Sequence, residues 1–205
     1  MKKILGIMLL CFLWSNPSIA VTFNEEKDKL PITPESIGEW DYTCKKEDFK
    51  KYVATIEGCI ALIKLGKIDK SKKKLVVFLH GDRREKSDYK IKENGNFTKA
   101  IKDQKDNINF FYLARPGHKF KGRSRSVGKY KNYEQLNHII QTVVFKKGWE
   151  SVRLVSQALY RLKEFYKPDE LIVIGFSGGS VNMSVIAGKV PGLVDQFSLN
   201  YFNNI

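Results

Sequence analysis

The chain has 205 residues, of which 42% are hydrophobic and 28% charged, so it is long enough for one folded domain with a hydrophobic core. This composition excludes collagen-like, coiled-coil and low-complexity proteins. The formal net charge of +14 is spread over scattered lysines, and no recognisable nucleic-acid-binding module accompanies it. The charge therefore predicts weak attraction to an anionic membrane or cell-wall polymer and no specific nucleic-acid partner.

The first twenty residues are typical of a secretory signal peptide. Lys2 and Lys3 give a positive start, and an almost unbroken apolar run follows from Ile4 to Trp14. Ser18-Ile19-Ala20 then offers small residues to a signal peptidase. The alternative is a membrane anchor, which needs about 20 apolar residues, and this run is shorter. We expect cleavage after Ala20 and a secreted or periplasmic protein formed by residues 21–205.

Two of the three cysteines, Cys44 and Cys59, lie outside this leader. An even number of cysteines in an oxidising compartment favours a disulfide, which would stabilise the fold by about 3 kcal/mol. The alternative is a pair of buried free thiols. A metal site is not expected, because no histidine or second cysteine pair lies near these residues in the sequence.

The first half of the chain predicts a hairpin followed by two buried strands. Apolar stretches at 52–56 and 59–63 flank Glu57-Gly58, as in a β-hairpin at the edge of a sheet. Leu75–Leu79 and Ile108–Leu113 are short apolar runs bounded by turn residues, which indicates strands buried on both faces. We expect a helix over 96–103 between these strands and an exposed basic loop over 118–132.

The second half predicts two helices and two more strands. Apolar residues recur at helical spacing from Trp149 to Tyr166, and Pro168 stops that helix. Leu171–Ile174 is a third buried strand, Val181–Ala187 a small apolar helix, and Phe197–Phe202 a last strand. Strands that alternate with helices predict an α/β fold, with a mostly parallel sheet, helices on both faces and the N-terminal hairpin at one edge.

Functional residues of such sheets gather at the carboxyl ends of the strands. Here these ends carry His80-Gly81, Arg115-Pro116-Gly117 and Phe176-Ser177. We expect the three segments to lie along one edge of the sheet.

Gly175-Phe176-Ser177-Gly178-Gly179 is a Gly-x-Ser-x-Gly pattern between a predicted strand and a predicted helix. A sharp turn there holds the serine hydroxyl out of the backbone, and small neighbours are needed because strand and helix crowd it. The N–H of Gly178 would form half of an oxyanion hole, worth about 3 kcal/mol in the transition state. The alternative is a glycine-rich turn that binds phosphate or nothing, but the lysine of a phosphate loop is absent.

Phe78-Leu79-His80-Gly81, followed by Gly175 to Ser180, resembles the α/β-hydrolase superfamily over about residues 75–202. The resemblance implies hydrolysis of a small ester, peptide or amide through an acyl-enzyme on Ser177, without metal or organic cofactor. It also implies that the His80-Gly81 turn supplies the second oxyanion N–H, from Asp82 or Arg83, and that His80 is structural. We expect His118 either to lie at the cleft mouth or to be solvated, and His138 to be a surface or interface residue.

The sequence departs from the family at the other two residues of the triad. The family places an acid and then a histidine after the serine, whereas no histidine follows Ser177 and Asp195 is the only acid there. Three explanations stay open: a hydrolase that is incomplete at its C-terminus, one part of a split protein, and a noncatalytic binding protein with a hydrolase-like fold. A further alternative is a basic protein that binds anionic cell-envelope polymer. Substrate and oligomeric state are not predicted.

Overall fold

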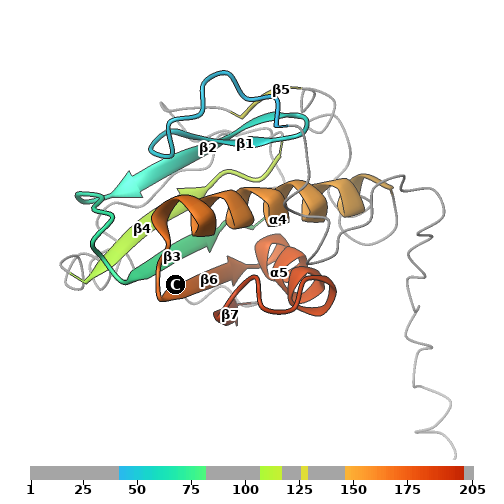
Figure 1. The fold of residues 1–205 in the computed structure, drawn as a ribbon. Coiled ribbons are helices and arrows are strands. Elements are labelled where there is room, and N and C mark those ends of the chain that lie inside the picture. The colour runs from blue at the N-terminus through green and yellow to red at the C-terminus, as the bar shows by residue number, and fades with distance from the viewer. Residues whose placement is uncertain (1–41, 82–106, 117–125, 129–145, 201–205) are drawn as a thin grey trace, which may run out of the picture.

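The computed structural model describes residues 42–81, 107–116, 126–128 and 146–200. Figure 1 shows the strands forming one twisted sheet, with two helices beside it. The elements in chain order are β1 (Tyr52–Thr55), β2 (Gly58–Leu65), β3 (Lys74–Leu79), β4 (Ile108–Leu113), β5 (Val127–Gly128), α4 (Lys146–Tyr166), β6 (Glu170–Phe176), α5 (Gly178–Lys189) and β7 (Gln196–Asn200).

The sheet has the order β1-β2-β4-β3-β6-β7, with β5 paired to β2 off this path. β1 and β2 form an antiparallel hairpin in which Thr55 pairs with Gly58, and β2 also lies antiparallel to β4. β3 is parallel to both of its neighbours, and β7 is parallel to β6. The predicted α/β fold, with a mostly parallel sheet and the N-terminal hairpin at one side of it, is confirmed.

The register of the parallel strands brings three chain segments to one edge of the sheet. Leu79, the last residue of β3, pairs with Leu113 on one side and with Gly175 on the other. The residues that follow each strand therefore emerge side by side, and these include His80, Arg115 and Ser177. The expected convergence of the strand ends is confirmed.

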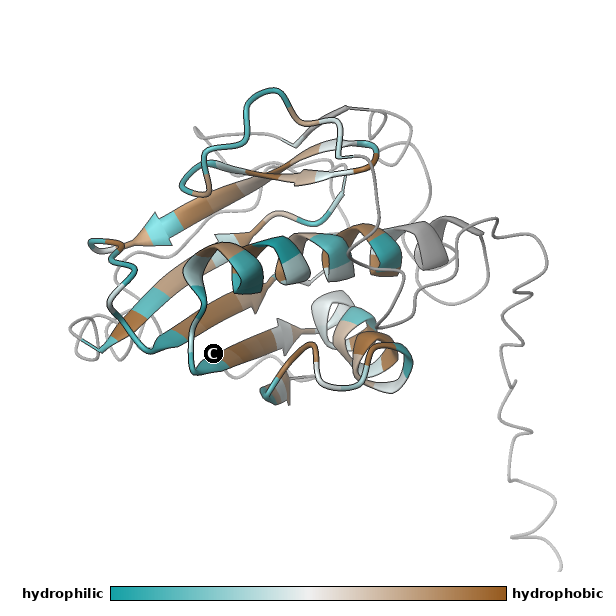
Figure 2. Cartoon of the chain, in the orientation of Figure 1, coloured by the Kyte–Doolittle hydropathy of each residue, from teal (hydrophilic) through white to brown (hydrophobic). Residues whose placement is uncertain are grey.

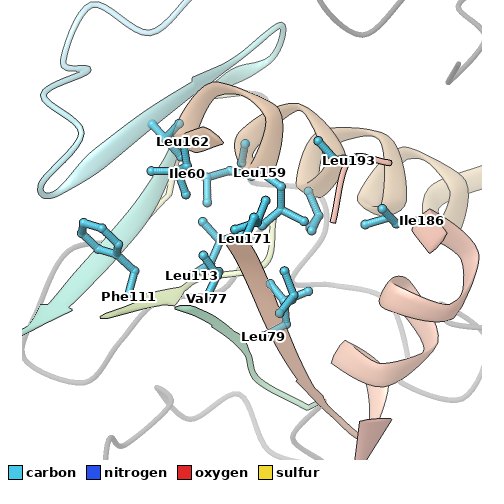
Figure 3. Close-up of a cluster of buried hydrophobic side chains, with 14 of the residues drawn as sticks. Ile60, Val77, Leu79, Phe111, Leu113, Leu159, Leu162, Leu171, Ile186 and Leu193 are labelled. Carbon is cyan, nitrogen blue, oxygen red and sulfur yellow. The ribbon is translucent and has the colours of Figure 1, made fainter. Parts of the chain in front are cut away.

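One face of the sheet carries both α4 and α5. Alternate residues of the strands point into this layer, where they meet apolar side chains of the two helices. Figure 3 shows these side chains gathered beneath α4, and Figure 2 shows that the surface of α4 away from the sheet is hydrophilic. The cluster includes Leu75, Val77, Leu79, Phe111, Leu113, Leu154, Leu159, Leu162, Leu171, Val173, Met183 and Ile186.

The opposite face holds a second apolar cluster, in which Phe78 and Phe110 each lie edge-on to Tyr112, with ring centroids 5.2 and 5.1 Å apart. All three aromatic side chains are buried. Among the described residues, no helix belongs to this cluster; both described helices lie on the first face.

The C-terminal end of α4 agrees with the helical spacing and the proline that predicted it. Apolar residues at helical spacing bury one side of the helix, and it ends at Tyr166, two residues before Pro168. Lys167 then adopts φ 46°, and its N–H donates to the carbonyl of Lys163 at 2.8 Å. This is the left-handed residue that closes many helices, here supplied by lysine in place of glycine.

The expectation of an exposed loop over 118–132 is wrong at 126–128. Val127 and Gly128 pair with Cys59 and Gly58 of β2, and Ser126 is buried. The reason is a hydrogen bond that composition does not reveal: the N–H of Ala61 donates to Ser126 Oγ at 3.1 Å. The rest of that loop and the helix expected over 96–103 lie outside the described residues.

Cys44 and Cys59 form a disulfide that fastens the segment before β1 to β2. The N–H of Thr43 also donates to the carbonyl of Thr55 at 3.1 Å, so this segment runs beside the hairpin. Among the helices of the described ranges, none is long and apolar enough to cross a membrane.

Candidate active site

Ser177 stands between β6 and α5 in a strained backbone conformation. Its φ is 51° and its ψ −117°, in a part of conformational space that residues other than glycine rarely occupy. Such a conformation costs on the order of 1–3 kcal/mol and persists only where the surroundings enforce it. The residue is half-buried at the edge where β6 ends.

The first turn of α5 begins on Ser177 itself. The N–H groups of Ser180 and Val181 donate to the Ser177 carbonyl at 2.8 and 3.2 Å. A serine at this position usually turns its hydroxyl onto the helix, but the Ser177 side chain makes no such capping bond. The N–H of Gly178 precedes the helical ladder, and the positive end of the helix lies beside the serine. This arrangement favours negative charge that develops next to Ser177.

Three glycines allow the backbone to pass this closely, because a Cβ at each would collide with a neighbour. A Cβ at Gly175 would lie 2.8 Å from the carbonyl oxygen of Gly179. A Cβ at Gly179 would overlap the carbonyl of Leu79 and lie 2.9 Å from the carbonyl oxygen of His80. A Cβ at Gly81 would lie 2.8 Å from the Cβ of Ser177. The strand, the helix and the His80-Gly81 turn therefore meet at the serine.

Ser180 fastens this junction, a role that the sequence analysis missed. It is fully buried, and its hydroxyl donates to the carbonyl of Gly175 at 2.7 Å. The bond joins the first turn of α5 to the end of β6 across Ser177. A second serine three residues after Ser177, in the first turn of the helix, was the available signal.

His80 is buried, with 1% of its surface exposed, and both ring nitrogens are engaged. The N–H of Arg115 donates to Nε2 at 3.1 Å, so Nε2 is an acceptor. Nδ1 lies 2.8 Å from the carbonyl oxygen of Gly81, which only accepts, so Nδ1 carries the proton. Neither nitrogen is available to take a proton from Ser177, and this geometry suits the structural role that the resemblance implies for His80.

Comparison with known proteins finds solved structures that are similar to this chain at low sequence identity. Neither a protein-family model nor a curated protein matches the chain. Among solved structures, it is similar to 2-hydroxy-6-oxo-6-phenylhexa-2,4-dienoate hydrolase from Rhodococcus sp. strain RHA1, with 14% identity, a TM-score of 0.42, and coverage of 78% of this chain and 46% of that one. It is also similar to an esterase from Pyrococcus furiosus, with 17% identity, a TM-score of 0.40, and coverage of 77% and 51%.

The chain spans about half the length of these two hydrolase structures. Similarity at these TM-scores does not decide a family. The α/β fold described above therefore rests on the strand order, the register and the strand–helix turn of this chain.

Asp195 does not belong to the Ser177 site. Its carboxylate accepts the N–H of Leu171 at 2.7 Å and pairs with Lys163 Nζ at 3.1 Å. Leu171 lies at the start of β6, and Ser177 follows the end of that strand, about 20 Å away at the usual rise per residue. The only acid after Ser177 in the sequence therefore supports the opposite edge of the sheet.

The remaining predicted site residues are outside the described ranges. Asp82, the expected second oxyanion donor, is one of them, as are His118 and His138. Within the ranges that are described, no group of three or more His, Cys, Asp or Glu side chains is placed to hold a metal ion.

Proposed function

We propose that this protein is an exported serine hydrolase that cleaves an ester, peptide or amide bond through an acyl-enzyme on Ser177. The observation that carries the proposal is the strained backbone of Ser177 at the start of α5, with a hydroxyl that does not cap the helix. Strain of this kind clusters at functional sites, because nothing in the packing of an ordinary strand–helix turn needs it.

The proposed reaction begins with attack of Ser177 Oγ on the substrate carbonyl carbon while a base accepts the hydroxyl proton. The carbonyl oxygen becomes an oxyanion beside the Gly178 N–H, with Asp82 proposed as the second donor. Collapse expels the alcohol or amine together with a proton and leaves an ester on Ser177. Water then hydrolyses that ester and restores the hydroxyl.

The proposed reaction needs a base other than His80. The chain contains three histidines, and the ring nitrogens of His80 are both engaged. His118 and His138 are therefore the two histidines to substitute. A base supplied by this chain predicts that one of His118→Ala and His138→Ala abolishes reaction at Ser177. Labelling that survives both substitutions excludes these two histidines as the base.

A fluorophosphonate probe tests the proposal, because it reacts with serines that have an activating base and an oxyanion hole. We expect the purified protein to be labelled and Ser177→Ala to be unlabelled. Ser184→Ala is the matched control: Ser184 lies on the exposed side of α5, where its hydroxyl donates to the Ser180 carbonyl at 3.1 Å. This control should label like the unchanged protein.

Labelling that survives Ser177→Ala contradicts the assignment of the nucleophile. Complete absence of labelling contradicts the hydrolase proposal and favours the alternative, a noncatalytic binding protein with a hydrolase-like fold.

A further inference from the structure

Arg115 holds His80 at two places. Its backbone N–H donates to Nε2 of the imidazole at 3.1 Å, and its guanidinium Nη1 donates to the His80 carbonyl oxygen at 3.4 Å. One residue at the end of β4 thus contacts both the side chain and the main chain of a residue at the end of β3. Both residues are buried, with 7% of Arg115 and 1% of His80 exposed.

This pair of contacts fixes the imidazole in one state. Nε2 accepts from Arg115, and the Nδ1 proton points to the Gly81 carbonyl oxygen 2.8 Å away. A proton on Nε2 would set two donors against each other, and an imidazolium would also add a positive charge beside the guanidinium. The neutral tautomer with its proton on Nε2 would also lose the Nδ1 donor to the Gly81 carbonyl oxygen, whereas the imidazolium would keep that bond and oppose the Arg115 N–H.

The His80-Gly81 turn transmits any movement of its backbone to Ser177. The missing Cβ of Gly81 would lie 2.8 Å from the Ser177 Cβ, and that of Gly179 would lie 2.9 Å from the His80 carbonyl oxygen. The carbonyl that Arg115 holds is therefore one of the two, with that of Leu79, against which the first turn of α5 packs.

We propose that Arg115 is a positioning residue of the Ser177 site: its backbone N–H keeps His80 as the neutral Nδ1–H tautomer, and its guanidinium holds the His80 carbonyl and so fixes the His80-Gly81 turn beside the serine. Its effect on reaction rests on the function proposed above, whereas its effect on the imidazole does not. Arg115 touches no reacting atom in this proposal. It acts through His80, and this makes the state of the imidazole a direct readout.

The first measurement is nitrogen NMR of the purified protein labelled at histidine, with His80→Gln to assign the signal. We expect a neutral imidazole with its proton on Nδ1 at neutral pH. A proton on Nε2, or an imidazolium, would overturn the proposal whether or not the protein reacts with any probe.

The second measurement is the fluorophosphonate reaction, resolved into the maximal rate constant and the half-saturating probe concentration. Arg115→Met should lower the rate constant about 10- to 100-fold, as expected for a displacement of up to about 1 Å near the nucleophile, and should leave half-saturation unchanged. Arg115→Lys should recover most of the rate, because its ammonium can still donate to the His80 carbonyl.

Arg153→Met is the matched control, since Arg153 is equally buried and its guanidinium pairs with Glu57 in the turn between β1 and β2. It should lower stability and leave the rate constant of the folded protein unchanged. Equal rates for Arg115→Met and the unchanged protein, or equal loss in Arg115→Lys and Arg115→Met, would overturn the proposal. If Arg115→Met does not fold, the NMR measurement on the unchanged protein still decides the tautomer. An unchanged protein that shows the Nδ1–H tautomer but does not label would instead refute the function proposed above.

Discussion

Ser177 differs from the other residues with unusual backbone angles in the described part of the chain. Three non-glycine residues there have positive φ: Phe49, Lys167 and Ser177. Phe49 lies in the turn before β1, where its N–H donates to the Tyr52 carbonyl, and Lys167 closes α4. Ser177 begins α5, and its carbonyl accepts the N–H groups of Ser180 and Val181, but glycine could make the same bonds without strain. The serine at this position therefore supports the role proposed above for its hydroxyl.

Gly179→Ala tests the close approach of α5 to the His80-Gly81 turn. The added Cβ would overlap the Leu79 carbonyl, and backbone cannot yield as a flexible side chain does. We expect a loss of about 1–3 kcal/mol in the free energy of unfolding, measured by urea denaturation. In Gly188→Ala, on the same helix, the new Cβ meets nothing within 4 Å, and a gain of about 0.5–1 kcal/mol is expected. Equal effects of the two changes would refute this account of the junction.

At the scale of elements, the end of the sheet where β6 begins is held by the side chains of Asp195 and Lys163, which lie outside the Ser177 site. Burial raises the pKa of the Asp195 carboxyl, but hydrogen bonds from the Leu171 N–H and from Lys163 Nζ outweigh it and hold the pKa below its usual value. Lys163 also donates to the carbonyls of Gly192 and Leu193, so Asp195 and Lys163 together tie β6, α4 and the turn before β7.

A lowered pKa makes Asp195 stabilising above about pH 3.9, the value in an unfolded chain, and the stabilisation is lost as pH falls through the lower folded value. Asp195→Asn should therefore reduce the free energy of unfolding at pH 7, and the difference from the unchanged protein should shrink below about pH 4. Asp169→Asn is the control, because Asp169 and Lys73 form an exposed pair worth about 0–1 kcal/mol. A difference that grows toward pH 3 would contradict this interpretation of Asp195.

The sequence predicts the limits of a strand or helix best where turn residues lie at both of its ends. β4 covers Ile108–Leu113, the expected range, because turn residues end the apolar run on both sides. β6 and α5 extend two to three residues past their expected bounds, toward each other, so that only Ser177 separates them. β5 has two residues and no periodicity to detect, and its position depends on pairing with β2 far away in sequence.

The candidate site was predictable in part for the same reason. Ser177 and its glycines form a contiguous pattern with a local steric cause. The contacts of Ser180 with Gly175 and of Arg115 with His80 depend on how separate elements meet, and residue types alone do not reveal them.

At the scale of the whole molecule, the leader and the disulfide belong to one proposal about export. Oxidising compartments favour disulfides, and the Cys44–Cys59 bond fits a protein that has left the cytoplasm. Expressed with its full sequence in a secreting host, the protein should begin at Val21, as read by N-terminal sequencing of the exported form. Cys44 and Cys59 should resist alkylation until a reductant is added. Recovery of an uncleaved N-terminus from the membrane fraction would favour an anchor instead.

The most direct test of the central claim is isolation of the acyl-enzyme. An activated ester such as a p-nitrophenyl acetate should transfer one acetyl group to the purified protein, and acid quenching followed by peptide mass spectrometry should find it on Ser177. The Ser184→Ala control should acylate equally, and Ser177→Ala should not acylate. Failure to find the acetyl group on Ser177 when the probe ester is consumed, or its presence on other residues in Ser177→Ala at the same level, would contradict the account.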